Sequence, residues 1–194
     1  MARRHQRPAK QPIYIGCEGQ SEVAYAGLLE SILRDKQLGY HLVTDDLGKG
    51  AGSLEQKVRQ AHQNIETKLK QKYKFKKRYV MLDADVLNRD ESRRRAIERE
   101  AADYNIVVIW QRPCFEAVLL NHIERCEYHE PSDSKIAEAQ LKKQCPAYSK
   151  PPSIAMLKQC LPDWLQSGPF ARGARRHGEL DELLRFIGVI DRTI

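Results

Sequence analysis

The strongest indication of the fold is the stretch Tyr79-Val80-Met81-Leu82-Asp83-Ala84-Asp85, in which an uninterrupted apolar run leads directly into two carboxylates. A shorter apolar run, Ile13-Tyr14-Ile15, precedes Glu18 in the same way. Buried strands of parallel sheets form such continuous runs, and open α/β sheets bind ligands outside the carboxyl ends of their strands. If both runs belong to one parallel sheet, Glu18, Asp83 and Asp85 emerge at the same edge. Three converging carboxylates need a compensating charge, which a divalent cation such as Mg²⁺ supplies.

The chain alternates between expected strands and helices up to residue 124. We predict strands at 12–17, 41–44, 78–82 and 106–110, and helices at 21–36, 53–69, 91–103 and 113–123. Ser53 and Gln56 have the spacing of a capping box, and Pro113 suits a first helical turn. Because crossovers between parallel strands are right-handed, this order predicts an α/β fold: an open parallel sheet with helices on both faces.

Three regions follow from these patterns. Residues 1–11 are expected to form a basic, flexible tail, residues 12–124 the sheet domain, and residues 125–194 a helical extension that packs on it. Prolines divide the extension into short helices, of which 153–161 and 178–188 have the clearest apolar patterns.

The cysteines and the N-terminus bear on the cellular compartment. The five cysteines, at positions 17, 114, 126, 145 and 160, include no C-x-x-C pair. This spacing is typical neither of a zinc ribbon nor of a disulfide framework, so we expect reduced thiols, mostly in the core. No apolar stretch approaches the roughly 18–20 residues that cross a bilayer, and the basic N-terminus lacks the apolar segment of a signal peptide. We expect a cytoplasmic protein without a membrane partner.

The positive charge is concentrated in clusters. The net charge is +7, and residues 68–78 hold seven basic side chains in eleven, with Tyr73 and Phe75 between them. Such clusters gain affinity for phosphate backbones through counterion release, but the run equally suits a solvated helix end favoured by the helix dipole. If the chain binds nucleic acid, the expected contacts are Lys49, Lys70, Lys72, Lys74, Lys76, Lys77, Arg78, Arg172, Arg175 and Arg176.

The order of the motifs resembles a known group of proteins. An acidic residue after the first strand and an Asp-x-Asp after a later strand are similar to the Toprim fold of topoisomerases, primases and certain nucleases. Over about residues 13–124 the chain further resembles the RloB-like family. The resemblance is carried by Glu18-Gly19-Gln20-Ser21-Glu22, Gly48-Lys49-Gly50, Asp83-Ala84-Asp85, Arg112-Pro113-Cys114-Phe115-Glu116 and Leu119-Leu120-Asn121-His122. Gln20 and Ala84 depart from the family's pattern, which more often has a charged residue and an Arg there.

This resemblance implies a small bacterial Toprim protein of the kind regarded as phage-defence nucleases and often encoded near an ATPase. It implies that Glu18 acts as a general acid/base or a metal ligand, and that Asp83 and Asp85 bind Mg²⁺ or Mn²⁺. Glu116 would be a candidate ligand for a second metal, with Glu22 supporting the ligands.

Phosphodiester cleavage suits this set of carboxylates. One metal ion polarises a phosphoryl oxygen, and two ions about 3.5–4 Å apart clamp the attacking and leaving oxygens. Glu18 either acts as a base or orients a water molecule, and Glu116 is either a ligand or a first-turn carboxylate stabilised by the helix dipole. The glycine loop before Ser53 either contacts a phosphate, with help from Lys49, or only permits a tight turn.

The first functional hypothesis is therefore a Mg²⁺-dependent nuclease acting on DNA or RNA. One alternative is an effector subunit that is inactive alone and controlled by an ATPase partner, bound through residues 125–194 with Trp164 and Phe170 offering a surface. Another is a non-catalytic nucleic-acid-binding module. His122 is expected to face the core, and His177 to join a solvated basic surface or contact a phosphate.

Overall fold

The sheet has the predicted α/β architecture. The computed structural model describes residues 9–48, 52–87, 90–161 and 168–191, apart from the side chains of residues 168–170. Four parallel strands form one open sheet in the order β2-β1-β3-β4. The strands are β1 (Gln11–Cys17), β2 (Tyr40–Asp46), β3 (Lys77–Asp83) and β4 (Val107–Gln111). Each begins or ends within two residues of its prediction, because strands buried on both faces keep a continuous apolar signature.

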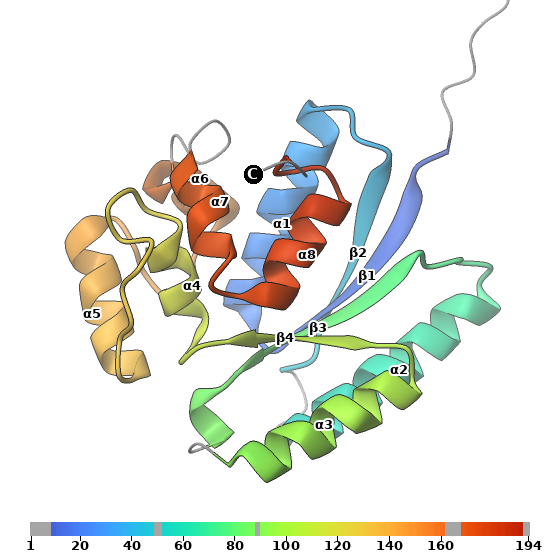
Figure 1. Cartoon of the computed structure of the whole chain (residues 1–194). Coiled ribbons are helices and arrows are strands. Elements are labelled where there is room, and N and C mark those ends of the chain that lie inside the picture. The colour runs from blue at the N-terminus through green and yellow to red at the C-terminus, as the bar shows by residue number, and fades with distance from the viewer. Residues whose placement is uncertain (1–8, 49–51, 88–89, 162–167, 192–194) are drawn as a thin grey trace, which may run out of the picture.

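Helices cover both faces of the sheet, as predicted (Figure 1). On one face, α2 (Leu54–Lys70) and α3 (Glu91–Asp103) pack against Val80 and Trp110. On the other face, α1 (Gln20–Asp35) and α8 (Gly178–Phe186) pack in one core with the side chains that β1 and β3 direct toward that face. The capping box of Ser53 and Gln56 starts α2, with Ser53 Oγ accepting from the Gln56 backbone at 3.3 Å.

The segments after β3 and β4 build the rest of the fold. They are η1 (Asp85–Leu87), α4 (Phe115–Asn121), α5 (Ser134–Gln144), α6 (Ile154–Cys160) and α7 (Gly168–Ala174). Helix α4 contacts α5 and α7, and α6 contacts α1. Leu141, Leu157 and Leu183 from this C-terminal region join the same core as Ile13. Within the described residues, no helix combines the length and the apolar character that crossing a membrane requires.

Pro113 does not occupy the first turn of a helix. Helix α4 begins at Phe115, with Cys114 as its N-cap, so Pro113 lies in the loop before it. The carbonyl of Pro113 accepts from the backbone N–H groups of Ala84 (3.1 Å) and Asp85 (2.9 Å). The prediction is wrong because this loop ties the end of β4 to the end of β3 before the helix starts.

The prediction that all cysteines are reduced is wrong for one pair. Cys145 and Cys160 form a disulfide, with their Cα atoms 5.3 Å apart, whereas Cys17, Cys114 and Cys126 are free and buried. Cys145 caps the C-terminus of α5 and Cys160 is the last residue of α6. The segment between these two helices brings the two cysteines together, and their spacing of 15 residues in the sequence does not predict this contact.

Candidate metal centre

Neighbouring parallel strands bring Glu18 and Asp83 together at the carboxyl edge of the sheet. Glu18 Oε2 accepts a hydrogen bond from the backbone N–H of Asp83 at 2.8 Å. Its other oxygen lies 2.6 Å from Nζ of Lys57 on α2, and both side chains of this ion pair are less than a fifth exposed. Asp83 Oδ1 in turn accepts from the backbone N–H of Phe115, at 3.0 Å, where α4 begins. Both carboxylates are thus fixed by the backbone of the sheet and of α4.

Glu22 is the third carboxylate of this cluster. Its side chain is buried near the start of α1, where Oε2 accepts from the Gly19 backbone at 3.1 Å. The buried amide of Gln111, at the end of β4, donates to both Glu22 Oε1 (3.0 Å) and Asp83 Oδ1 (2.8 Å). A single amide therefore links the buried carboxylate of Glu22 to the partly buried carboxylate of Asp83.

Burial and mutual repulsion shift the titration of these groups. Burial, with the charges of Glu22 and Glu18, raises the pKa of Asp83 to about 9. Burial, with the charges of Glu18 and Glu116, raises the pKa of Glu22 to about 7. Carboxyl groups held in this way are frequent at functional sites, and a cation placed among them would favour their ionised forms.

Glu116 lies behind the cluster and is almost completely buried. Tyr148 donates its hydroxyl to Glu116 Oε1 at 3.0 Å, and Nζ of Lys150 lies 2.8 Å from the same oxygen. Burial raises the pKa of Glu116, but the hydrogen bond and charge of Lys150 outweigh it, and the net shift is downward. Lys150 also lines a cavity of about 320 Å³ together with Glu18, Glu22 and Asp83.

Asp85 is separated from this cavity. The chain turns into η1 directly after β3, and the carboxylate of Asp85 accepts a hydrogen bond from Ser134 Oγ of α5. Asp85 lines a second, larger cavity instead. Glu18, Asp83 and Glu22 thus line one cavity and Asp85 lines the neighbouring one, although the charge of Asp85 still contributes to the raised pKa of Asp83.

The oxygen atoms of the cluster fit a hard divalent cation by their chemistry. Mg²⁺ and Mn²⁺ prefer carboxylate ligands, and here Asp83 and Glu22 repel each other in a buried setting. In the part of the chain that the structure describes, no three His, Cys, Asp or Glu side chains are arranged to hold a metal ion as they stand. Glu18 and Glu116 are each held by a lysine instead. Because Glu18, Glu22 and Asp83 line the cavity of about 320 Å³ and Glu116 does not, these three are the candidate ligands.

Several residues at this edge were not predicted from the sequence. Lys57 and Lys150 lie on α2 and in the segment between α5 and α6, where no local pattern marks them. Gln111 and Asp46 could have been found, since each ends a strand as Asp83 does. Asp46 accepts hydrogen bonds from the side chain of Gln20 and the backbone of Gly48.

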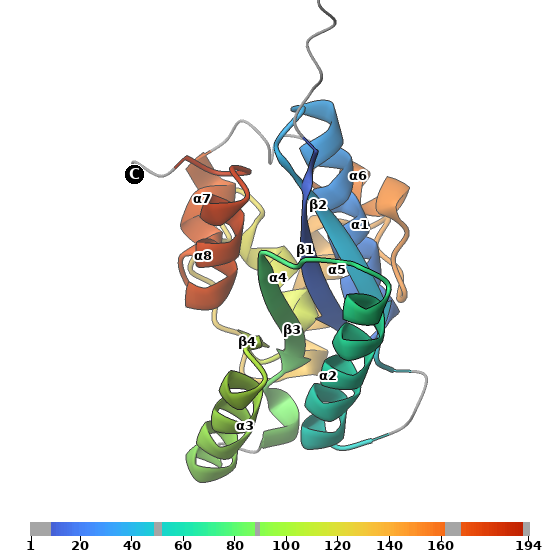
Figure 2. The ribbon, with the colours of Figure 1, turned by 90° about the vertical axis from the view of Figure 1, so that its right-hand side faces the viewer.

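The basic run 68–78 lies at the opposite edge of the sheet. Lys77 begins β3 and Asp83 ends it, so the two are about 20 Å apart at about 3.3 Å per residue. Figures 1 and 2 show the loop between α2 and β3 at one end of β3 and η1 at the other. Lys68 pairs with Asp45, and Lys77 pairs with Glu182. Arg78 donates to the carbonyl of Tyr104. The remaining lysines of the run are exposed: Lys70, Lys72, Lys74 and Lys76.

The basic residues near the C-terminus, Arg172, Arg175, Arg176 and His177, are only partly exposed to solvent. Arg172 pairs with Glu127 and Arg176 with Glu130, while Arg175 is exposed. His177 is buried as the N-cap of α8, with Nε2 3.1 Å from Asn121 Oδ1. Burial, with the charges of Arg176 and Arg112, lowers the pKa of His177 to about 4. The expectation of a solvated His177 is wrong, because α7 and α8 enclose it against α4.

The remaining predictions have mixed outcomes. His122 faces the core as predicted; it is buried and lies 3.0 Å from the hydroxyl of Tyr25. Gly48 packs tightly, since an added Cβ would lie 2.6 Å from the carbonyl oxygen of Glu18. Lys49, Trp164 and the side chain of Phe170 lie outside the described residues.

Comparison with known proteins identifies the family. The family model described as RloB-like protein matches residues 13–165, which extends the resemblance beyond residue 124 to include α5, α6 and Lys150. No curated protein and no solved structure matches the chain. Because the match covers well over half of its residues, the chain belongs to the RloB-like protein family.

Proposed function

We propose that this protein is a metal-dependent nuclease that hydrolyses phosphodiester bonds of DNA or RNA. The observation that carries the proposal is the contact between Glu18 and Asp83, joined to Glu22 through Gln111 at the carboxyl edge of a parallel sheet. This placement supports a Toprim-like site, and the family resemblance supports a role in defence against phage.

The residues have separate tasks in the proposed reaction. Glu18, Glu22 and Asp83 would hold Mg²⁺ or Mn²⁺, and such an ion neutralises the phosphate and activates water when it is bound. Glu18 is fixed by Lys57 and the Asp83 backbone, so it is placed to orient or deprotonate the attacking water. Lys150, about half exposed beside the cluster, supplies positive charge for the phosphate.

Cleavage assays test the proposal. Labelled single-stranded DNA, duplex DNA and total tRNA are incubated with Mg²⁺, Mn²⁺ or EDTA. We expect metal-dependent cutting of at least one substrate, and a loss of about a thousandfold for Asp83→Asn, which removes the central carboxylate. Asp35→Asn, at the exposed end of α1, is the matched control and should cut as the wild type does. Full activity in Asp83→Asn would contradict the proposed site.

One observation favours a second version of this function, in which the chain is inactive alone and an ATPase partner controls it. Lys57 pairs with Glu18 of the site and Lys150 pairs with the neighbouring Glu116, and a bound partner could separate these pairs. In that case the isolated chain is silent in the assays and becomes active only in the complex. Nucleic-acid binding in EDTA without cleavage under any condition, with or without the partner, would instead indicate a non-catalytic binding module.

A further inference from the structure

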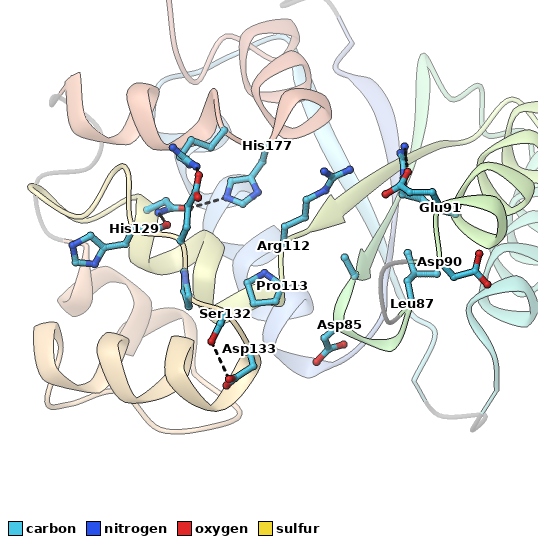
Figure 3. A pocket seen from close by; sticks show the side chains of 16 residues that line it. Asp85, Leu87, Asp90, Glu91, Arg112, Pro113, His129, Ser132, Asp133 and His177 are labelled. Carbon is cyan, nitrogen blue, oxygen red and sulfur yellow. Dashed lines mark hydrogen bonds and ion pairs between the residues drawn. The ribbon is translucent and has the colours of Figure 1, made fainter.

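A second cavity, of about 610 Å³, opens next to the candidate metal centre. The ends of β3 and β4 contribute residues both to the carboxylate cluster and to the second cavity. Asp83 and Gln111 are register partners on β3 and β4 and belong to the carboxylate cluster. The residues that follow them, Ala84 and Arg112, line the second cavity (Figure 3). A ligand lying across this edge of the sheet would therefore meet both cavities in succession.

The wall of the second cavity is held by buried contacts. Asn121 at the end of α4 is buried, and its Nδ2 donates to the carbonyls of Cys126 (3.0 Å) and His129 (2.9 Å). Its Oδ1 lies 3.1 Å from Nε2 of His177. Helix α7 packs directly on this point, because a Cβ on Gly173 would lie 1.9 Å from the Asn121 carbonyl oxygen. One side chain thus fixes two segments of the wall.

Arg112 is distinguished from the other cations of the cavity. Arg94 pairs with Glu91 and Glu98, and Arg176 pairs with Glu130. Arg112 is exposed and has no hydrogen-bond or ion-pair partner within the described ranges. In Figure 3 its side chain extends between His177 and Glu91. An exposed guanidinium above a preformed cavity is suited to bind a phosphate with two parallel hydrogen bonds.

We propose that this cavity binds the nucleotide adjacent to the cleaved phosphodiester bond, with Arg112 on its phosphate and its base inside. The proposal rests on the proposed nuclease function and specifies its substrate as single-stranded or locally unpaired nucleic acid. The volume lies within the range of about 300–1,000 Å³ typical of small-ligand pockets. A base enters such a pocket only after it leaves the stack, which costs least in single strands. A carboxylate accepts several hydrogen bonds, so Glu130 of the wall can accept from a base amino group while it pairs with Arg176, and Asp133 can do so while it caps α5.

Binding measurements in EDTA test this proposal without cleavage. The probes are fluorescein-labelled single strands of DNA and of RNA, each 12 nucleotides long. Each is compared with its blunt-ended duplex at the same salt concentration. We expect the wild type to bind one or both single strands about tenfold more tightly than the duplexes. Arg112→Gln should weaken single-strand binding about tenfold, because a charge-assisted contact is lost. Arg34→Gln, an exposed arginine at the end of α1, is the matched control and should change binding less than twofold.

A second variant covers the case that Arg112→Gln does not fold. Ser132→Trp places a large side chain on the exposed rim of the cavity, away from the metal centre, and should weaken single-strand binding to a similar degree. Equal binding of duplex and single strands overturns the proposal, and so does unchanged binding in the folded variants. Either result would leave the nuclease itself intact if cleavage is seen. Conversely, selective single-strand binding that depends on Arg112 in a protein that never cleaves would uphold the cavity and refute the nuclease.

Discussion

The two edges of the sheet differ in the burial of their charged side chains, if the carboxyl edge is compared with the amino edge, where β3 begins. At the carboxyl edge, Glu22 and Glu116 are buried and Asp83 is partly buried, and each is held by specific donors. At the amino edge, Lys70 and Lys72 are exposed to solvent. Burying like charges close together costs free energy, whereas a solvated lysine costs little. This contrast favours the carboxylates, and not the more conspicuous basic run, as the candidate functional site.

The largest effect on stability is expected from replacing Lys57, and Lys70 of the same helix provides the comparison. Lys57, at the carboxyl edge, forms a mostly buried pair with Glu18, whereas Lys70 ends α2 at the amino edge. Lys57→Gln leaves the Glu18 carboxylate unpaired and should lower the free energy of unfolding by about 3 kcal/mol. Lys70→Gln should change it by less than about 0.5 kcal/mol. Urea denaturation measures both, and equal losses would remove the contrast between the edges.

The disulfide should stabilise the carboxyl edge by a similar or smaller amount. Cys145 and Cys160 enclose the segment that carries Tyr148 and Lys150 to Glu116. Replacing both cysteines by Ser should lower the free energy of unfolding by about 3 kcal/mol or less, from the loop that the bond closes. Cleavage should fall as well, because Lys150 is then less firmly positioned. Denaturation with and without a reductant measures the first effect; wild-type cleavage rates in the double variant would contradict the second.

The stability of the metal-free protein should fall as the pH rises. The pKa of Asp83 is raised to about 9, so the folded state binds a proton that an unfolded Asp releases near its ordinary value of about 3.9. The resulting stabilisation is present at low pH and is lost as the pH rises through 9. Between pH 5 and pH 9 the loss should exceed about 1.4 kcal/mol, the value of one pKa unit. Thermal melts in EDTA test this, and Asp83→Asn should show a flatter profile; an identical slope in that variant would exclude Asp83 as the source.

The smallest effect is expected at the amino edge. Replacing Lys70, Lys72, Lys74 and Lys76 together by Gln removes exposed charge just before β3, a strand whose first residue lies about 20 Å from Asp83. Affinity for a 40-nucleotide substrate should fall about threefold, and this affinity should depend less on salt. Affinity for a 12-nucleotide strand should fall less. Fluorescence anisotropy at several salt concentrations measures this. A larger loss for the short strand would assign the run to the catalytic site.

The sequence predicts the sheet well because its signals are local. Strand burial on both faces produces apolar runs, and the capping residues of α2 and the charged pattern of residues 91–103 lie within the helices they define. Glu18 and Asp83 could be placed together because parallel strands end at the same edge.

What the sequence did not predict depends on contacts between distant segments. Lys57 and Lys150 reach the site from a helix and a loop whose positions are set by packing. The turn into η1 diverts Asp85, and the burial of His177 depends on its contact with Asn121 of α4. None of these has a signature within a few residues of the chain.

Thermal unfolding with and without Mg²⁺ or Mn²⁺ tests whether the carboxylate cluster is a metal site. A cation that binds the folded state raises the melting temperature as its concentration rises above its dissociation constant. We predict that millimolar Mg²⁺ or Mn²⁺ stabilises the wild type and the Asp35→Asn control but not Asp83→Asn. A wild type that is unaffected by either ion, or an equal shift in Asp83→Asn, would contradict a metal centre at Glu18, Glu22 and Asp83.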